Sequence, residues 1–279
     1  MIGYTVGAPA GALRRAVGPY VGYTERAAYP LARREVAVSR CVLVLGWGVP
    51  LDVRDPRGPS GGATGVASFA AGLSDSYVDT LTAPGTAAGI QVMLDPLVAA
   101  RLLGRPFGEV ANRVVAVSML DGAGLRDLRA LPDRLGAATR WDERFALLDR
   151  AFGARLADTP EPDRRLAGAW RQLRLSGGGI PVDRLATLTG WSRRHLSAVF
   201  RRELGLPPKV LARLIRFERA YGSAGRAASD GWAAVAADAG YYDQAHLIRD
   251  FRTFTGSTPS RLTPPPADSP ALQTAATQA

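Results

Sequence analysis

The chain has 279 residues, of which 47% are hydrophobic and 22% charged, and its net charge is +10. This composition is ordinary for a globular protein of about two domains. The sequence has no apolar run long enough for a membrane span and no signal-peptide pattern, so we expect a cytoplasmic protein without a membrane partner. One cysteine and two histidines exclude an intramolecular disulfide and most transition-metal sites, and we expect neither a metal nor another cofactor.

Short strands are expected in the first 95 residues. β-Branched residues between Gly and Pro, as in 34–49 and 87–94, favour extended structure. Asp95 as an N-cap and Pro96 in the first turn then predict a helix, which Gly104 ends.

Helices are expected to follow these strands. Apolar residues recur at helical spacing in 141–156, and the polar, Pro-rich residues 158–163 suit a linker. The sequence therefore predicts an α+β, β-rich N-terminal domain over 1–157. Residues 263–279 lack a periodic apolar pattern and are expected to form a disordered tail.

The excess positive charge is confined to the segment after the linker. Residues 164–262 hold 17 basic and 7 acidic side chains, whereas residues 1–163 hold 18 and 17. A basic domain joined to a near-neutral one is typical of a protein that binds a polyanion. The alternative is a generic solvated surface.

Residues 195–208 are repeated 51 residues later, at 246–259. The two copies share six identities, which pair His195 with His246, Leu196 with Leu247, Phe200 with Phe251, Arg201 with Arg252, Gly205 with Gly256 and Pro208 with Pro259. Ser192 and Asp243 are placed to cap a helix in each copy, with Phe200 and Phe251 on the inward face.

A shorter helix is expected before each of these two helices. Gly190 and Gly240 can supply the left-handed turn that separates the two helices of each copy. A short helix, a Gly turn and a capped second helix predict helix-turn-helix motifs at 182–204 and 232–254. Because His195 and His246 hold equivalent places, packing or phosphate contact accounts for them better than metal binding or catalysis does.

Residues 164–262 resemble the double helix-turn-helix domain of the AraC family of bacterial transcriptional regulators. The resemblance is carried by "GWSRRHLSAVFRRELGLPPKVLARLIRFERA" and by "GYYDQAHLIRDF" followed by "GSTPSR". It implies an all-α domain of seven helices in which a long helix, here about 208–221, joins the motifs. It also implies a sequence-specific regulator whose N-terminal domain senses a small molecule or mediates self-association.

The resemblance also implies DNA-binding positions. The family's base-reading positions match Arg194, Ser197, Ala198, Gln244, Ala245 and Arg249. Arg can bond bidentately to guanine, Gln can pair with adenine, and Ala can meet a thymine methyl group. The flanking arginines are expected to hold phosphates, and they are Arg193, Arg201, Arg202 and Arg252. A solvated helix face is the alternative for any one of these arginines.

Double-stranded DNA is therefore the expected partner. RNA polymerase, an unknown small-molecule effector and a second copy of the chain are further candidates. By analogy with the family, a cupin-like barrel is the favoured fold of the N-terminal domain, and the absence of His before position 195 excludes a cupin-type metal centre.

No catalytic residues and no enzyme activity are expected. One alternative is an alkyl-accepting or thiol-reactive protein that uses Cys41 and carries a DNA-binding module. A buried hydrophobic role for Cys41 is favoured instead, because it lies within the apolar run "CVLVL". A regulator without a ligand, controlled by its abundance alone, is a third reading.

Overall fold

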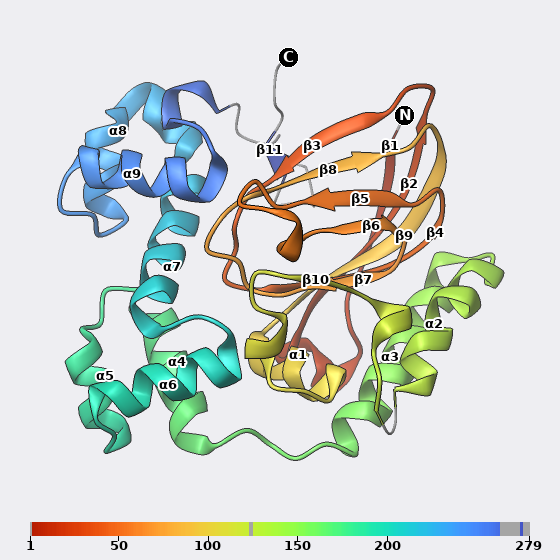
Figure 1. The fold of residues 1–279 in the computed structure, drawn as a ribbon, viewed down its shortest axis with the longest axis horizontal. Coiled ribbons are helices and arrows are strands. Elements are labelled where there is room, and N and C mark those ends of the chain that lie inside the picture. Colours follow the sequence, from red (N-terminus) through yellow and green to blue (C-terminus); the bar gives the residue numbers. More distant parts are fainter. Residues whose placement is uncertain (1, 123–124, 263–273, 276–279) are drawn as a thin grey trace.

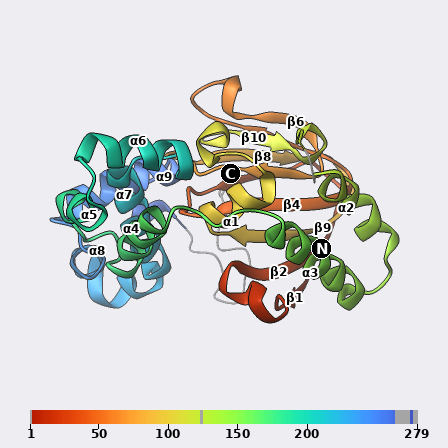
Figure 2. The same ribbon diagram turned by 90° about the horizontal axis from the view of Figure 1, so that it is seen from below.

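The computed structural model describes residues 2–122, 125–262 and 274–275 (Figure 1). A β-rich N-terminal domain and a helical C-terminal domain lie side by side, as two views at right angles show (Figures 1 and 2). This arrangement confirms the expected order of an α+β domain followed by an all-α domain. None of the described helices is both long and apolar enough to cross a membrane.

The N-terminal domain is built on two antiparallel sheets. Its strands are β1 (Ile2–Gly7), β2 (Val17–Ala27), β3 (Leu31–Glu35), β4 (Cys41–Gly48), β5 (Leu51–Arg54), β6 (Ala63–Val66), β7 (Phe69–Ala71), β8 (Val78–Thr82), β9 (Gly85–Leu94) and β10 (Val114–Ala116). One sheet has the order β1-β2-β9-β4-β7-β10, and the other has β3-β8-β5-β6. Two facing antiparallel sheets are also the general form of cupin-type double sheets.

Alternation along the central strand β4 separates two apolar regions. Leu43 and Leu45 belong to a large core that includes the helices, whereas Val44 packs with Val53 and Phe69 between the sheets. Successive side chains of a strand point to opposite faces, so one strand serves both regions.

The extended run expected at 34–49 is divided in the structure. β3 ends at Glu35 in one sheet and β4 begins at Cys41 in the other. Residues 36–40, which we call the crossing loop, therefore connect the two sheets. Apolar composition alone does not distinguish one long strand from two short ones that change sheets.

Three α-helices accompany the sheets: α1 (Pro96–Leu103), α2 (Arg126–Ala137) and α3 (Trp141–Ala157). The predicted limits of α1 are confirmed. The Asp95 carboxylate accepts a hydrogen bond from the backbone N–H of Leu97 at 3.0 Å, and Gly104 ends the helix at a φ of 67°. Asp95 and Gly104 each satisfy a local requirement of a helix end, which is why the sequence predicts them.

The C-terminal domain consists of helices. They are α4 (Arg164–Leu175), α5 (Val182–Thr189), α6 (Arg193–Leu204), α7 (Pro208–Gly222), α8 (Ala227–Asp238) and α9 (Gln244–Thr255). Seven helices were expected. Among the described residues α8 consists of two helical segments that meet at a kink at Gly231, with a φ of 78° and a ψ of 158°, so the six labelled helices comprise seven segments.

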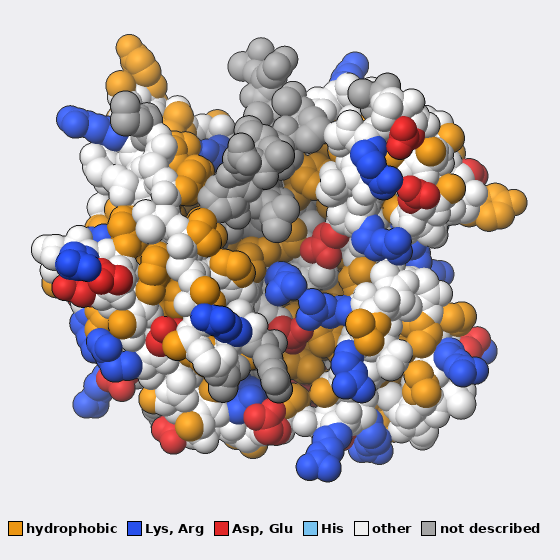
Figure 3. Space-filling model, turned by 180° about the vertical axis from the view of Figure 1, so that it is seen from behind, with side chains coloured by type: hydrophobic (Ala, Val, Ile, Leu, Met, Phe, Trp, Pro, Cys, Tyr) orange, Lys and Arg blue, Asp and Glu red, His pale blue; other side chains and the backbone are white. Residues whose placement is uncertain are grey.

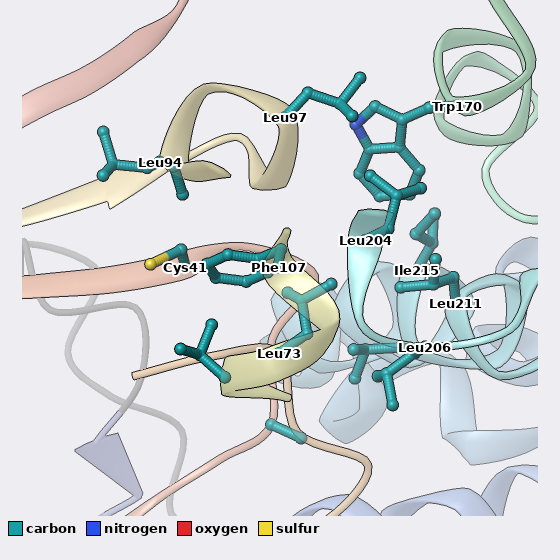
Figure 4. Packing of buried hydrophobic residues seen from close by; sticks show 14 of the residues in the cluster. Cys41, Leu73, Leu94, Leu97, Phe107, Trp170, Leu204, Leu206, Leu211 and Ile215 are labelled. Carbon is teal, nitrogen blue, oxygen red and sulfur yellow. The ribbon is translucent and has the colours of Figure 1, made fainter. Parts of the chain in front are cut away.

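One hydrophobic core joins the two domains. Leu97 and Phe107 from the N-terminal domain belong to the same buried cluster as Trp170, Leu204 and Leu206 from the C-terminal domain (Figure 4). Phe107 and Leu204 are fully buried. The domains are therefore packed against each other through an apolar interface and are not connected by the linker alone.

The expected disordered tail, 263–279, lies outside the described residues except for Thr274 and Ala275. These two residues form the short strand β11 (Thr274–Ala275), which pairs antiparallel with Glu35 and Arg34 at the edge of the second sheet.

Candidate nucleic-acid interface and interior cavity

The two copies of the repeat fold in the same way at their turns. Ser192 Oγ accepts from the backbone N–H of His195 at 3.2 Å, and a carboxylate oxygen of Asp243 accepts from that of His246 at 2.6 Å. Both predicted N-caps are confirmed. Gly190 and Gly240 have φ values of 68° and 82°, in the left-handed region that favours glycine.

The histidines make equivalent aromatic contacts in the two copies. The His195 ring meets the Trp191 ring edge to face at 5.2 Å, and the His246 ring meets the Tyr241 ring at 5.0 Å. Each contact connects the loop between the two helices of a motif to the N-terminal end of the second helix. The structure thus gives both histidines a packing role, which is the role that their equivalent places indicate.

The apolar residues of the repeat point inward. Phe200 and Phe251 are both fully buried. The Phe251 ring meets the Phe217 ring of α7 edge to face at 5.1 Å. The inward face inferred from helical spacing is therefore correct in both copies.

The predicted DNA-binding side chains lie on the opposite, outward faces of α6 and α9. All of them are exposed except Ser197, which is half-buried. Figure 2 shows both helices toward one side of the domain, with α4, α5 and α8 toward the other. The two predicted sets belong to these two helices: Arg193, Arg194, Ser197, Ala198, Arg201 and Arg202 to α6, and Gln244, Ala245, Arg249 and Arg252 to α9.

The arginines of this face differ in their neighbours. Arg193 forms an ion pair with Asp183, and Arg202 forms one with Glu203 at 2.6 Å. Among the described residues, Arg194, Arg201, Arg249 and Arg252 have no acidic partner. An arginine without an acidic partner attracts a polyanion more strongly, because no nearby carboxylate offsets its charge. Basic side chains also occur on the rear face of the C-terminal domain (Figure 3), so positive charge is not unique to the outward faces of α6 and α9.

The N-terminal domain contains a cavity of about 190 Å³ between its two sheets. Its wall is mainly apolar and includes Val42, Val44, Val53, Val66, Val78 and Phe69. Cavities of this kind, with few polar groups, suit small organic molecules. Among the described residues, no cluster of His, Cys, Asp and Glu could hold a metal ion.

Polar groups line one part of this cavity. Arg33 donates to both carboxylate oxygens of Glu25, with Nη1 to Oε2 at 3.0 Å. Tyr4 and Tyr23 line the same cavity, and burial raises the pKa of Tyr23 to about 12. Both phenols are therefore protonated at neutral pH and can donate a hydrogen bond.

The crossing loop links this cavity to the C-terminal domain. Val36, Ala37, Val38 and Arg40 line the cavity. The Ala37 N–H donates to the carbonyl of Phe254 in α9 at 3.0 Å. Ser39 donates its N–H and its hydroxyl to Glu218 of α7. One five-residue segment thus contacts the cavity, the helix that joins the two motifs and the second motif itself.

Sequence reasoning missed these interdomain residues. Ser39 and Glu218 are 179 positions apart, and no spacing rule connects them. The sequence predicts Asp95 as a helix cap, but it does not show that Asp95 also contacts the C-terminal domain. Its other oxygen accepts from Trp170 Nε1 at 2.8 Å and from Arg174 at 2.9 Å, both in α4.

Cys41 is fully buried at the start of β4. Burial raises the pKa of its thiol far above the usual range. A protonated thiol without access to solvent is a poor nucleophile. The structure thus favours the hydrophobic role of Cys41 over an alkyl-accepting one.

Comparisons with known proteins add a family match in the C-terminal region. Residues 185–263 match the family model of a helix-turn-helix domain. No curated protein matches the chain.

Similar solved structures cover most of the chain at low identity. ToxT from Vibrio cholerae O395 is 9% identical and aligns with a TM-score of 0.46 over 88% of this chain and 96% of that one. The same protein bound to (E)-4-(8-methylnaphthalen-1-yl)but-3-enoic acid is 10% identical, with a TM-score of 0.49 over 88% and 97%. The AraC-like transcriptional activator CuxR is 16% identical, with a TM-score of 0.26 over 79% and 87%.

Proposed function

We propose that the region of residues 185–263, which matches a helix-turn-helix family model, is a DNA-binding domain of the AraC type, and that the chain is a sequence-specific transcriptional regulator. In this proposal α6 and α9 enter two successive major grooves on one side of the DNA. Base readout belongs to Arg194, Ser197 and Ala198 of α6 and to Gln244, Ala245 and Arg249 of α9. The flanking arginines hold phosphates.

The duplicated reading helix is the observation that carries this proposal. Each copy has a capped first turn, a buried phenylalanine and an outward face with arginines that have no acidic partner. The buried Leu196 and Phe200 of α6 recur as Leu247 and Phe251 in α9, whereas most outward positions differ: Ala198 in α6 corresponds to Arg249 in α9. Two helices of one design with different outward residues suit two different base sequences.

A small molecule in the N-terminal cavity is the proposed signal. The cavity is large enough for a compact organic molecule with a mostly apolar body and one or two polar groups. Its occupant would contact the crossing loop, whose neighbours are α7 and α9. A ligand can shift the DNA-binding domain only by binding its two arrangements with different affinity, and the loop is where such a difference would arise.

Footprinting of the full chain on its operator tests the DNA-binding part. Two protected patches about ten base pairs apart are expected, because successive major grooves on one side are about 34 Å apart. Protection of one patch alone would contradict the duplicated reader. The operator itself would come from mapping of bound chromosomal sites.

The further partners of this proposal follow from its DNA target. A bacterial regulator of this type acts in the cytoplasm, where the chromosome lies, and meets RNA polymerase at promoters. A second copy of the chain could bind a neighbouring half-site, which sedimentation of the protein with and without operator DNA would detect. The helix-turn-helix match supports a role in regulation, and no catalytic role is part of this proposal.

A further inference from the structure

A buried acid in the second motif has no counterpart in the first. Asp250 lies on the inward side of α9 and is 1% exposed. The equivalent position in α6, 51 residues earlier, is Val199, which is buried among apolar side chains. The first motif shows that this position needs only an apolar residue for packing, so Asp250 calls for a separate explanation.

Asp250 is paired with Arg213 of α7. Its Oδ1 accepts from Nε of Arg213 at 3.0 Å and from Nη2 at 2.6 Å. Within the described part of the chain, its Oδ2 has no hydrogen bond, but the carboxylate lies near Tyr241 of the turn, and burial together with this carboxylate raises the pKa of that phenol. The Arg213 guanidinium also lies 5.4 Å from the centre of the Phe254 ring. These contacts hold the guanidinium in one place, beside α9.

Stability does not account for this pair. Moving two charges out of water is costly, and replacing a buried ion pair by apolar residues of similar size is often neutral or stabilising. Val199 is the apolar solution at the equivalent place in the same domain. We therefore look to the position of Arg213 for the role of the pair.

Arg213 lies in a surface hollow on the side of α9 that faces α7. The hollow is lined by Arg213, His246, Arg249, Asp250, Arg252 and Thr253. Three arginines and one aspartate give it an excess of positive charge. Asp250 accepts from Nε and Nη2 of Arg213, and Nη1 donates to none of the described residues. Nη1 is therefore available to a ligand in the hollow.

The place of α7 in the fold indicates what enters this hollow. α7 connects the two motifs and lies between them (Figure 1). If α6 and α9 occupy successive major grooves, the sugar-phosphate strands that border the intervening minor groove must pass between the motifs. The hollow is lined by Arg213 of α7 and by residues of α9, so it lies where the connecting helix meets the second motif, and one of these strands would run past it.

We propose that Arg213, held in position by Asp250, binds a DNA backbone phosphate that sits in this hollow between the two reading helices. This inference rests on the proposed DNA-binding function. Arg213 is a positioning contact that carries no base information, and Asp250 acts only through it.

The first test replaces the pair in the full chain by apolar residues, as Arg213→Leu together with Asp250→Val. This double variant keeps the net charge and copies the packing of the first motif. We expect an unchanged midpoint in urea, affinity about tenfold lower on operator and scrambled DNA alike, and a slope of log K against log salt reduced by about one. The matched control, Arg140→Leu with Asp142→Val, removes an exposed pair of α3 and should keep the wild-type slope.

The second test uses the wild-type protein and therefore does not depend on how the variant folds. Single phosphates of the operator are replaced by neutral methylphosphonates, one position at a time. One replacement between the two major-groove segments should weaken wild-type binding several-fold, whereas replacements outside the protected region should not.

The outcomes separate this inference from the proposed function. If the wild-type chain binds operator DNA with two protected patches but no phosphate between them matters, the role given to Arg213 is wrong. The same conclusion follows if the folded double variant keeps the wild-type salt slope. Failure of the wild-type chain to bind any operator would instead overturn the proposed function.

Discussion

Ser39 donates its backbone N–H and its hydroxyl to the two carboxylate oxygens of Glu218, at 2.7 and 2.6 Å. Ser39 is buried in the crossing loop, and Glu218 belongs to the helix that joins the two helix-turn-helix motifs. One residue of the crossing loop, whose neighbours line the cavity, therefore donates to both oxygens of a carboxylate in the other domain.

Ser39→Ala should destabilise the protein. The variant leaves one oxygen of the half-buried Glu218 carboxylate without its donor, which costs about 1–3 kcal/mol of unfolding free energy. Urea unfolding followed by tryptophan fluorescence measures this loss. Ser60→Ala, at an exposed position, is the control and should change the unfolding free energy by less than about 0.5 kcal/mol. Equal stability of both variants would mean that Glu218 does not depend on Ser39.

Glu218 should make stability depend on pH. Burial raises its pKa above the ordinary 4.5, although the Ser39 donors, Arg40 and Arg174 act in the opposite direction. Between the unfolded and folded pKa values the folded protein binds more protons than the unfolded one. The contribution of Glu218 to stability therefore falls as pH rises from about 4.5 through the folded pKa.

Urea melts of wild type and Glu218→Gln at several pH values from about 4 to about 8 check this expectation. Glutamine does not titrate, so the stability of wild type relative to the variant should decrease with rising pH across this window. A difference that stays constant with pH would show that Glu218 has the same pKa in the folded and unfolded states.

Phe200→Ala and Phe251→Ala should each cost about 3–5 kcal/mol, because both rings are fully buried and their removal leaves a cavity. Equilibrium unfolding in urea measures the loss. Tyr242→Ala removes an aromatic ring that is 94% exposed in the second turn, and it should leave stability within about 0.5 kcal/mol of wild type. Similar midpoints for all three variants would contradict the assigned inward face.

Arg249 and Arg252 should differ in what they recognise. Arg249→Ala should lose about 1–3 kcal/mol on the operator and relax the preference at one base pair, as expected of a base reader. Arg252→Ala should weaken binding to operator and scrambled DNA alike and reduce the salt slope by about one. Titrations of both variants on both DNAs at several salt concentrations distinguish the two roles. An equal loss on both DNAs for Arg249→Ala would remove it from the base readers.

Local signals in the sequence predicted much of the second domain. Ser192 and Asp243 are helix caps whose hydrogen-bond partners lie within three residues, and Gly190 and Gly240 supply the positive φ that each turn requires. Asp95 is a cap of the same kind in the first domain. The repeat itself identified Phe200 and Phe251 as buried, because one period of 51 residues places both on the same face. Such features depend on neighbours along the chain, so a sequence can show them.

Contacts between segments far apart in the chain could not be predicted from the sequence. The change of sheet at residues 36–40 lies within one apolar run, and nothing in that run marks the end of β3. The sequence does mark Asp250 as unusual, because a charged residue stands there next to the core residue Phe251, where the first copy has the apolar Val199. Its partner Arg213 is one of several arginines in α7, and only the fold selects it.

The buried cluster that contains Phe107 and Leu206 limits how this chain can be rearranged. Each half completes the packing of the other, so a C-terminal half cut at the linker would present Leu204, Leu206 and Trp170 to water. Grafting the DNA-reading half onto a foreign sensor would require a new partner surface of matching shape. For the same reason we expect heat to melt both halves together, in one transition, where loosely tethered units would melt in two.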